Sequence, residues 1–324
     1  MKTEFRCTSS SKLLQALLAM GPFCLLALTL QAAPQAAQKT ATSPAAKAFD
    51  SPQNAAEALI AAVEKFDEAA LEEIFGPDGR DLILTGEEAL DRQRIAKFAA
   101  LARQKNSVSI DPKYPNIATL IVGEEDWPLP VLIVKQGGKW SFDAVTGRQE
   151  ILYRRIGDNE LNAIKVCRGF VEAQHEYALV KRDGSGVNQY AQRIISTPGK
   201  QDGLAWRNPD GTWGGPVGEG IARMIEQGYT SRSEPFHGYF FKLLKGQGPA
   251  APLGELDFVV NGVMIGGFAL AAAPAEYQET GVMTFIVSHD GVVYETDLGP
   301  DTLSLFAKME RYNPDETWVP TDDQ

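Results

Sequence analysis

The run Phe236-His237-Gly238-Tyr239-Phe240-Phe241 opens the stretch that decides the fold, which continues through Val259-Val260-Asn261-Gly262-Val263-Met264 and closes with Ile286-Val287-Ser288-His289-Asp290-Gly291-Val292-Val293. Apolar, strand-like segments alternate in it with Asn-Gly and Asp-Gly pairs. These pairs are the strongest short-range signals of a β-hairpin. Residues 236–299 are therefore predicted to form an antiparallel sheet.

A long helix and an irregular segment precede this sheet. Arg148–Arg155 is predicted to be a connecting helix that stops at Gly157, where Asp158 caps the next helix. That second helix carries an apolar stripe to about Leu179. Short helices are expected around Tyr190–Ile195 and Ile221–Gly228, and a closing helix over Asp301–Arg311. Residues 196–220, rich in Gly, Pro, Asp and Trp, are predicted to be irregular, and residues 151–324 to form one α+β domain.

A first domain is predicted over residues 49–150. Ser51-Pro52 can cap a helix whose inward face carries apolar residues at helical spacing, namely Ala56, Leu59, Ile60 and Val63. A second, short helix capped by Asp67 and a third helix over Glu87–Arg103 are predicted to follow. Strands are then expected over 117–122, 129–135 and 139–143, with a Gly137-Gly138 turn between the last two. Helices followed by an antiparallel meander indicate an α+β domain that resembles the cystatin-like and NTF2-like group of folds.

The N-terminus has the layout of a secretory signal peptide. Basic residues precede an apolar stretch over Leu13–Leu30, and small residues with possible cleavage near Ala32-Ala33 follow. An uncleaved anchor is the alternative, because the stretch is about long enough to span a bilayer. Residues 1–33 are thus predicted to be a signal peptide and residues 34–48 a disordered linker. We expect a periplasmic or secreted protein that is not inserted in the membrane after cleavage.

Composition limits the possible functions. The 324 residues are 44% hydrophobic and carry a formal net charge of −11. Such a charge argues against a nucleic-acid partner, which calls for a basic surface. Outside the predicted signal peptide Cys167 is the one cysteine, and its place on an apolar helical face predicts a buried, inert thiol.

Histidines are the first candidates for chemistry. His237 precedes a strand, and His289 precedes Asp290 in a hairpin turn, so either could act as a general base with a nearby carboxylate. The competing interpretation has His289 exposed at its turn and His237 bonded to backbone, because no nucleophile is visibly paired with either. His175-Glu176 begins like a zinc-protease motif, but position 179 is Leu179 where a second histidine is needed.

The sequence offers two further kinds of candidate site. Asp183, Ser185 and Asn188 resemble a calcium loop, but the first and last ligand positions would fall on Lys181 and Gln192, so a plain turn is favoured and no cofactor or metal is predicted. Ligand binding could use tryptophans: Trp127 and Trp140 on the first domain's concave sheet, or Trp206 and Trp213 in the irregular segment.

Several motifs resemble an uncharacterised family of exported bacterial proteins, the DUF 2950 family. They span about residues 49–320 and include Phe49-Asp50-Ser51-Pro52, Asp126-Trp127-Pro128, Tyr190-Ala191-Gln192-Arg193, Ser196-Thr197-Pro198-Gly199-Lys200-Gln201-Asp202-Gly203-Leu204 and Asp290-Gly291-Val292-Val293-Tyr294. The resemblance implies export to the periplasm or cell surface and implies no reaction. The order of elements in the C-terminal half also resembles a pilin or pseudopilin globular domain, an analogy of fold and not of function.

These observations leave three hypotheses. The first is a non-enzymatic envelope protein that acts by binding or assembly, with another envelope protein as a possible partner. The second is an envelope hydrolase using His237 or His289, and the third is a small-ligand-binding protein. A local function is expected where the irregular segment after Ser196 meets the C-terminal sheet.

Overall fold

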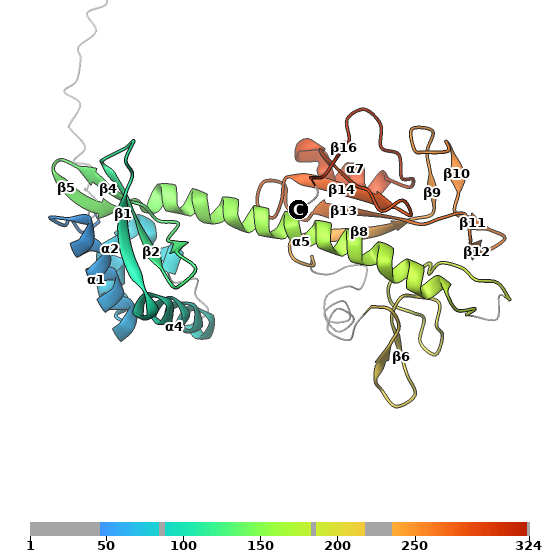
Figure 1. Ribbon diagram of the computed structural model, residues 1–324, viewed down its shortest axis with the longest axis horizontal. Coiled ribbons are helices and arrows are strands. Elements are labelled where there is room, and N and C mark those ends of the chain that lie inside the picture. Colours follow the sequence, from blue (N-terminus) through green and yellow to red (C-terminus); the bar gives the residue numbers. More distant parts are fainter. Residues whose placement is uncertain (1–45, 84–87, 183–185, 218–234, 323–324) are drawn as a thin grey trace, which may run out of the picture. The chain divides into compact units, whose positions relative to one another are not determined.

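The computed structural model describes residues 46–83, 88–182, 186–217 and 235–322, and its class is α+β, as predicted (Figure 1). Two hydrophobic cores form within residues 43–324, which make one compact unit. One core lies among the helices and sheet before residue 143, and the other around the C-terminal sheet. The proposed boundary at residue 150 stays a prediction. The expected signal peptide and the helix at Ile221–Gly228 lie outside the described residues.

The first core is covered by helices whose ends follow the predicted caps. α1 (Pro52–Lys65) begins at Ser51, whose side chain accepts a hydrogen bond from the Asn54 amide at 3.1 Å. α2 (Glu68–Phe75) begins at Asp67, which accepts from the Ala70 amide at 3.0 Å. A 3-10 turn (Pro77–Gly79), α3 (Arg80–Ile83) and α4 (Glu88–Gln104) complete the helical layer. Capping satisfies amides that the first turn leaves without partners.

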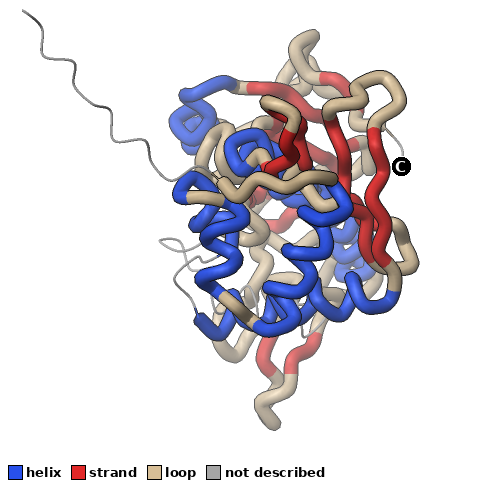
Figure 2. The backbone as a smooth tube through the Cα atoms, turned by 90° about the vertical axis from the view of Figure 1, so that its left-hand side faces the viewer, coloured by secondary structure: helices blue, strands red, loops and turns tan. Residues whose placement is uncertain are grey.

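An antiparallel sheet follows, with strand order β1-β2-β4-β5 and β3 paired to β2. Its strands are β1 (Asn106–Ile110), β2 (Ile117–Val122), β3 (Trp127–Pro128), β4 (Ile133–Gln136) and β5 (Lys139–Phe142). Gly137 and Gly138 join β4 to β5 with φ of 57° and 84°, which glycine adopts readily. Helices α1 and α4 pack on this sheet, and Figure 2 shows the helices of this half gathered on one side of its strands.

A single helix, α5 (Ala144–Ala178), joins both cores. The prediction that a helix stops at Gly157 and another begins at Asp158 is wrong. Gly157 lies in open space on the helix, and an interior glycine costs only about 1 kcal/mol relative to alanine. Packing at both ends of α5 outweighs that cost: Gly147 lies against Val131, and Cys167 is fully buried in the second core.

The C-terminal sheet is antiparallel, as predicted, with order β16-β15-β14-β13-β8. Its strands are β8 (Tyr239–Leu244), β13 (Ala269–Pro274), β14 (Met283–Ser288), β15 (Val293–Asp297) and β16 (Val319–Pro320). Every residue of β13 is buried, and both α5 and α7 (Thr302–Lys308) contact it. Since neighbouring side chains in a strand point to opposite faces, both faces of β13 are covered.

Among the described residues, three small two-stranded sheets lie outside this sheet. They pair β6 (Trp206–Arg207) with β7 (Trp213–Gly214), β9 (Gly246–Gln247) with β10 (Leu256–Asp257), and β11 (Val259–Val260) with β12 (Val263–Met264). Asn261 and Gly262 turn the last hairpin with φ of 51° and 82°, as the Asn-Gly signal predicts. The expected helix at Tyr190–Ile195 is wrong. This segment is irregular and not helical, because the Tyr190 amide bonds to the Met264 carbonyl and Ile195 bridges to Ala205.

Candidate functional site

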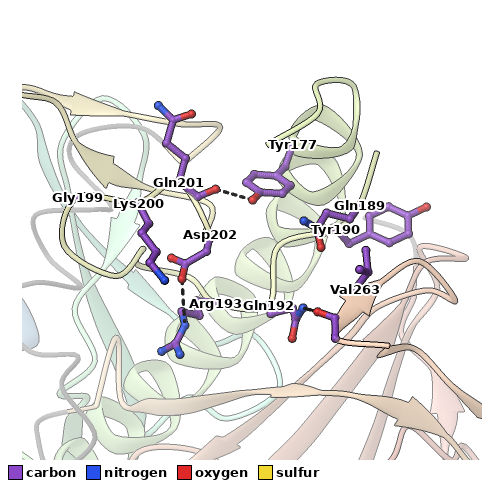
Figure 3. Close-up of a pocket in the computed structure, with 11 residues that line it drawn as sticks. Tyr177, Gln189, Tyr190, Gln192, Arg193, Gly199, Lys200, Gln201, Asp202 and Val263 are labelled. Carbon is purple, nitrogen blue, oxygen red and sulfur yellow. Dashed lines mark hydrogen bonds and ion pairs between the residues drawn. The ribbon is translucent and has the colours of Figure 1, made fainter. Parts of the chain in front are cut away.

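A cavity of about 620 Å³ lies where the segment after Ser196 meets the β11–β12 hairpin. We call it the loop cavity. Its walls come from the end of α5, from residues 189–193, from residues 199–202 and from the hairpin: Tyr177, Gln189, Tyr190, Gln192, Arg193, Gly199, Lys200, Gln201, Asp202, Gly262 and Val263. In Figure 3, Lys200, Asp202 and Arg193 lie together on one side, and Gln189, Tyr190 and Val263 lie on the other.

The loop Ser196–Gly203 is held closed by its own polar groups. Asp202 accepts hydrogen bonds from the Thr197 amide at 2.7 Å and the Thr197 hydroxyl at 2.8 Å. The Gly203 amide donates to the Ser196 hydroxyl at 2.8 Å. A Cβ at Gly203 would lie 2.7 Å from the Ser196 nitrogen, so the chain passes itself there at a distance that requires glycine. The loop therefore presents residues 199–202 in a fixed conformation.

Asp202 also shapes the charge of the cavity. Its side chain is 24% exposed, and its Oδ2 lies 3.7 Å from Nε of Arg193. Partial burial alone raises the pKa of Asp202, but the hydrogen bonds from Thr197 and the charge of Arg193 hold that pKa below its ordinary value. The carboxylate is thus ionised at neutral pH and engaged by groups of its own loop. Lys200 brings a second cation to the same lining.

The opposite wall is fixed to α5. Buried Gln174 donates to the Ala191 carbonyl at 2.9 Å and accepts from the Ala191 amide at 2.8 Å. These two hydrogen bonds from one side chain fix the position of residues 189–193 against α5. Gln192 donates to the Gly262 carbonyl at 2.7 Å, which ties this wall to the β11–β12 hairpin.

The end of α5 also holds the loop. Tyr177 Oη donates to the carbonyl of Gln201 at 2.5 Å. The guanidinium of Arg182 lies 5.0 Å from the Tyr177 ring and 4.7 Å from the Trp206 ring, within the range of cation–π attraction. The cavity is therefore pre-formed, with amide, phenol and cationic groups on its surface.

The structure does not bring His237 and His289 together. Ser288 pairs with Ala269 and Tyr239 pairs with Pro274, at the two ends of β13. At about 3.3 Å per residue these ends lie roughly 17 Å apart, so the two histidines occupy opposite ends of the sheet.

His289 is partly buried, so the interpretation that it is exposed at a turn is wrong. Its ring packs 6.0 Å from that of Phe258 and 6.2 Å from that of Phe268, and its buried Nδ1 has no hydrogen-bond partner among the described residues. Asp290 faces elsewhere: it accepts from the Ser288 hydroxyl at 2.9 Å and the Val292 amide at 3.1 Å. A base at His289 would need a carboxylate that this arrangement does not supply.

His237 is exposed, with φ of 46°, and lines an apolar cavity of about 470 Å³ that Glu172 also lines. Its ring lies 4.4 Å from that of Phe236. His175 is exposed on α5, with its ring 5.5 Å from that of Phe268.

Two of the tryptophan candidates are core residues. Trp140 is 5% exposed and Trp206 is 9% exposed, so both side chains are buried, and ligand binding by either stays a prediction. Trp213 is partly buried, and the guanidinium carbon of Arg207 lies over its ring, 4.3 Å from the ring centroid. Trp127 is 40% exposed and lines two cavities of the first half.

Metal binding gains no support within the described ranges. No group of three or more His, Cys, Asp or Glu residues is placed to hold a metal there. Asp183 and Ser185 lie outside the described residues, and Asn188 is exposed.

Cys167 is buried, as predicted, and burial raises its pKa to about 12, which keeps the thiol protonated. Among the described helices none combines the length and apolarity needed to cross a membrane.

The profile of the family described as "Protein of unknown function (DUF2950)" matches residues 46–321. The chain belongs to this family. The match confirms the resemblance drawn from the sequence motifs. Searches of curated proteins and of solved structures find no match. Two DUF2950 motifs noted in the sequence, Tyr190–Arg193 and Ser196–Leu204, supply most of the loop cavity's lining.

Arg193 and Lys200 were not foreseen as functional residues. Their sequence contexts show no charge cluster, and only the closure of the loop by Asp202 and Thr197 brings them to one lining. A weak signal was available in the Ser-Thr-Pro-Gly stretch, whose turn-forming residues indicate a compact loop.

Proposed function

We propose that this DUF2950 protein is an exported envelope protein that acts by binding, and that the loop cavity takes a small polyhydroxylated anion such as an acidic sugar. The single observation that carries the ligand class is the pair of cations, Arg193 and Lys200, on the lining of a pre-formed cavity. Among the described residues of that lining, Asp202 is the one carboxylate, and it is already engaged by Thr197. The described lining therefore has an excess of positive charge, although the chain as a whole is acidic.

The remaining groups suit hydroxyls. Gln189, Gln192 and Gln201 carry amides, each of which can donate and accept hydrogen bonds. Tyr190 adds an aromatic ring, which offers an apolar face to a sugar ring. The cavity volume of about 620 Å³ falls within the range of roughly 300–1,000 Å³ found for small-molecule sites.

The fixed walls of the loop cavity support a binding role for the protein. The loop is closed by Asp202 and Ser196, and the facing wall is fixed by Gln174, so little conformational entropy remains to be lost when a ligand enters.

Isothermal titration calorimetry tests the proposal. Glucuronate and galacturonate should bind saturably at low salt, and glucose should bind more weakly. Because cation–carboxylate hydrogen bonds contribute about 1.5–3 kcal/mol before solvent screening, the double variant Arg193→Gln/Lys200→Gln should weaken uronate binding at least about tenfold.

Lys308→Gln is the matched control, since it removes an exposed charge on α7 away from the cavity. It should bind uronates like the wild type. Absence of saturable binding by both uronates, or equal binding by the double variant, would contradict the proposal.

Export is the other half of the proposal and rests on the layout of residues 1–33. Intact-mass measurement of the protein from a bacterial envelope fraction should show a new N-terminus near Ala32-Ala33. A mature protein that retains Leu13–Leu30 would contradict cleavage and would favour an uncleaved anchor.

Hydrolysis is a second candidate because His237 and Glu172 line the same cavity, which brings a candidate general base and a carboxylate to one lining. A panel of ester, amide and glycoside substrates should reveal turnover that His237→Ala abolishes and His289→Ala leaves intact. Turnover unaffected by His237→Ala would remove this candidate.

A further inference from the structure

A second cavity, of about 240 Å³, lies in the first half between the helices and the sheet. We call it the helix–sheet cavity. Its deep walls are buried apolar side chains from α1, α2 and α4 and from the chain before β4: Leu59, Val63, Leu71, Phe75, Ile95 and Val131. An apolar molecule that packs against these walls removes apolar surface from water, which is favourable. The position therefore favours an apolar occupant.

The entrance is built from larger side chains. Trp127 and Ile151, which are 40% and 37% exposed, both line the cavity. The Trp127 ring is held by Arg154, whose guanidinium lies 5.7 Å from the ring centroid. Arg154 is itself fixed, because it donates to the Pro128 carbonyl at 2.8 Å and to Glu150 at 2.8 Å. The indole thus has a defined place at the mouth and does not fill the cavity.

The helix–sheet cavity adjoins a more polar one. That neighbour, of about 540 Å³, shares Arg94, Phe98 and Trp127 with it and adds Lys97, Gln104, Glu124 and Glu125. Among the described residues that line the helix–sheet cavity, Arg94 is the one charged side chain, and it is exposed. An apolar molecule that fills the deep part would therefore end beside a guanidinium, with Lys97 one helical turn further along α4.

We infer that the helix–sheet cavity binds an amphiphilic carboxylate, with its alkyl or aryl part among Leu59, Leu71 and Val131 and its carboxylate beside Arg94. A water molecule takes about 30 Å³ and a methylene group a similar volume, so 240 Å³ accommodates about eight carbons. The carboxylate lies beside Arg94 because this guanidinium is the charged group that the described residues supply to the cavity's lining. This site shares no residue with the loop cavity and does not depend on the function proposed for it.

Calorimetry with three eight-carbon probes tests the inference on the purified protein. Octanoate should bind saturably, octanol about two- to fivefold more weakly, and octylamine more weakly still, since an exposed ion pair contributes only a small factor. Octanoate that binds no better than octylamine, or no saturable binding by any of the three, overturns the inference.

Variants locate the site. Ile151→Trp should abolish octanoate binding by closing the entrance, and as a change at a partly exposed position it should leave the circular dichroism spectrum unchanged. Arg94→Gln should weaken octanoate two- to fivefold and leave octanol unchanged. Arg92→Gln is the matched control: it removes the same charge from α4, where the guanidinium lies 4.5 Å from the Phe66 ring, outside both linings. An equal loss of octanoate affinity in Arg92→Gln and Arg94→Gln would contradict the placement of the carboxylate beside Arg94. Full octanoate binding by a folded Ile151→Trp would contradict the placement of the site in the helix–sheet cavity.

Discussion

Replacement of Asp202 by alanine tests whether the loop that carries Lys200 is held by one carboxylate. Asp202→Ala removes the acceptor of two hydrogen bonds from Thr197, at 2.7 and 2.8 Å, and the charge that faces Arg193. The side chain is 24% exposed, so solvent replaces part of what is lost. We expect the free energy of unfolding to fall by about 2 kcal/mol at pH 7, the scale of a lost charge-assisted hydrogen bond. Urea denaturation followed by circular dichroism measures this difference.

The stability difference between the wild type and Asp202→Ala should also depend on pH. Because the folded-state pKa of Asp202 lies below its ordinary value, the stabilisation is fully present above the unfolded-state pKa of about 3.9. It is lost as the pH falls through the folded-state pKa. The difference between wild type and Asp202→Ala should therefore shrink at pH values below about 4.

Asp210 provides the matched control. It also accepts from the amide and hydroxyl of a threonine, Thr212, but on one oxygen, and it is fully exposed in the β6–β7 hairpin. Asp210→Ala should destabilise the protein much less than Asp202→Ala. Equal stability of Asp202→Ala and wild type at pH 7, or an equal loss in both variants, would refute the account of the loop.

Three further predictions concern other parts of the chain. Gly157→Ala should raise the free energy of unfolding by about 0.5–1 kcal/mol in urea denaturation, because Gly157 lies in open space within α5, and any loss of stability would mean that α5 is not continuous there. Gly203→Ala should weaken uronate binding in calorimetry, because its Cβ would lie 2.7 Å from the Ser196 nitrogen and force the loop open; unchanged binding would show that loop closure does not matter. Cys167 should react with a thiol reagent at pH 8 only in urea, since burial raises its pKa to about 12, and rapid labelling of the native protein would contradict its burial.

Local signals in the sequence were enough to predict much of the fold. Ser51 and Asp67 begin helices because their side chains satisfy amides within three residues, and Gly137-Gly138 and Asn261-Gly262 turn hairpins because of the backbone angles they adopt. Gly157 misled the prediction, because packing at both ends of α5 outweighs one glycine. The Tyr190–Ile195 segment was also misjudged, since its backbone bonds to partners more than ten residues away, such as Met264.

The sites depend on contacts that the sequence does not display. Arg193, Lys200 and the amide side chains meet because Gln174 fixes one segment to α5 and Asp202 closes the loop that forms the other. Trp140 and Trp127 lie close together in the sequence, yet one is in the core and the other at a cavity entrance. Family membership follows from motifs spread along the chain, and the DUF2950 match over residues 46–321 confirms it.

Nuclear magnetic resonance with glucuronate tests the central claim most directly. Addition of glucuronate to the ¹⁵N-labelled protein should shift backbone amide signals of residues 189–193 and 199–202 in a saturable way, and leave those of β14 and of the first half unchanged. Shifts absent from both loop segments, or spread evenly over the chain, would contradict a ligand site in the loop cavity.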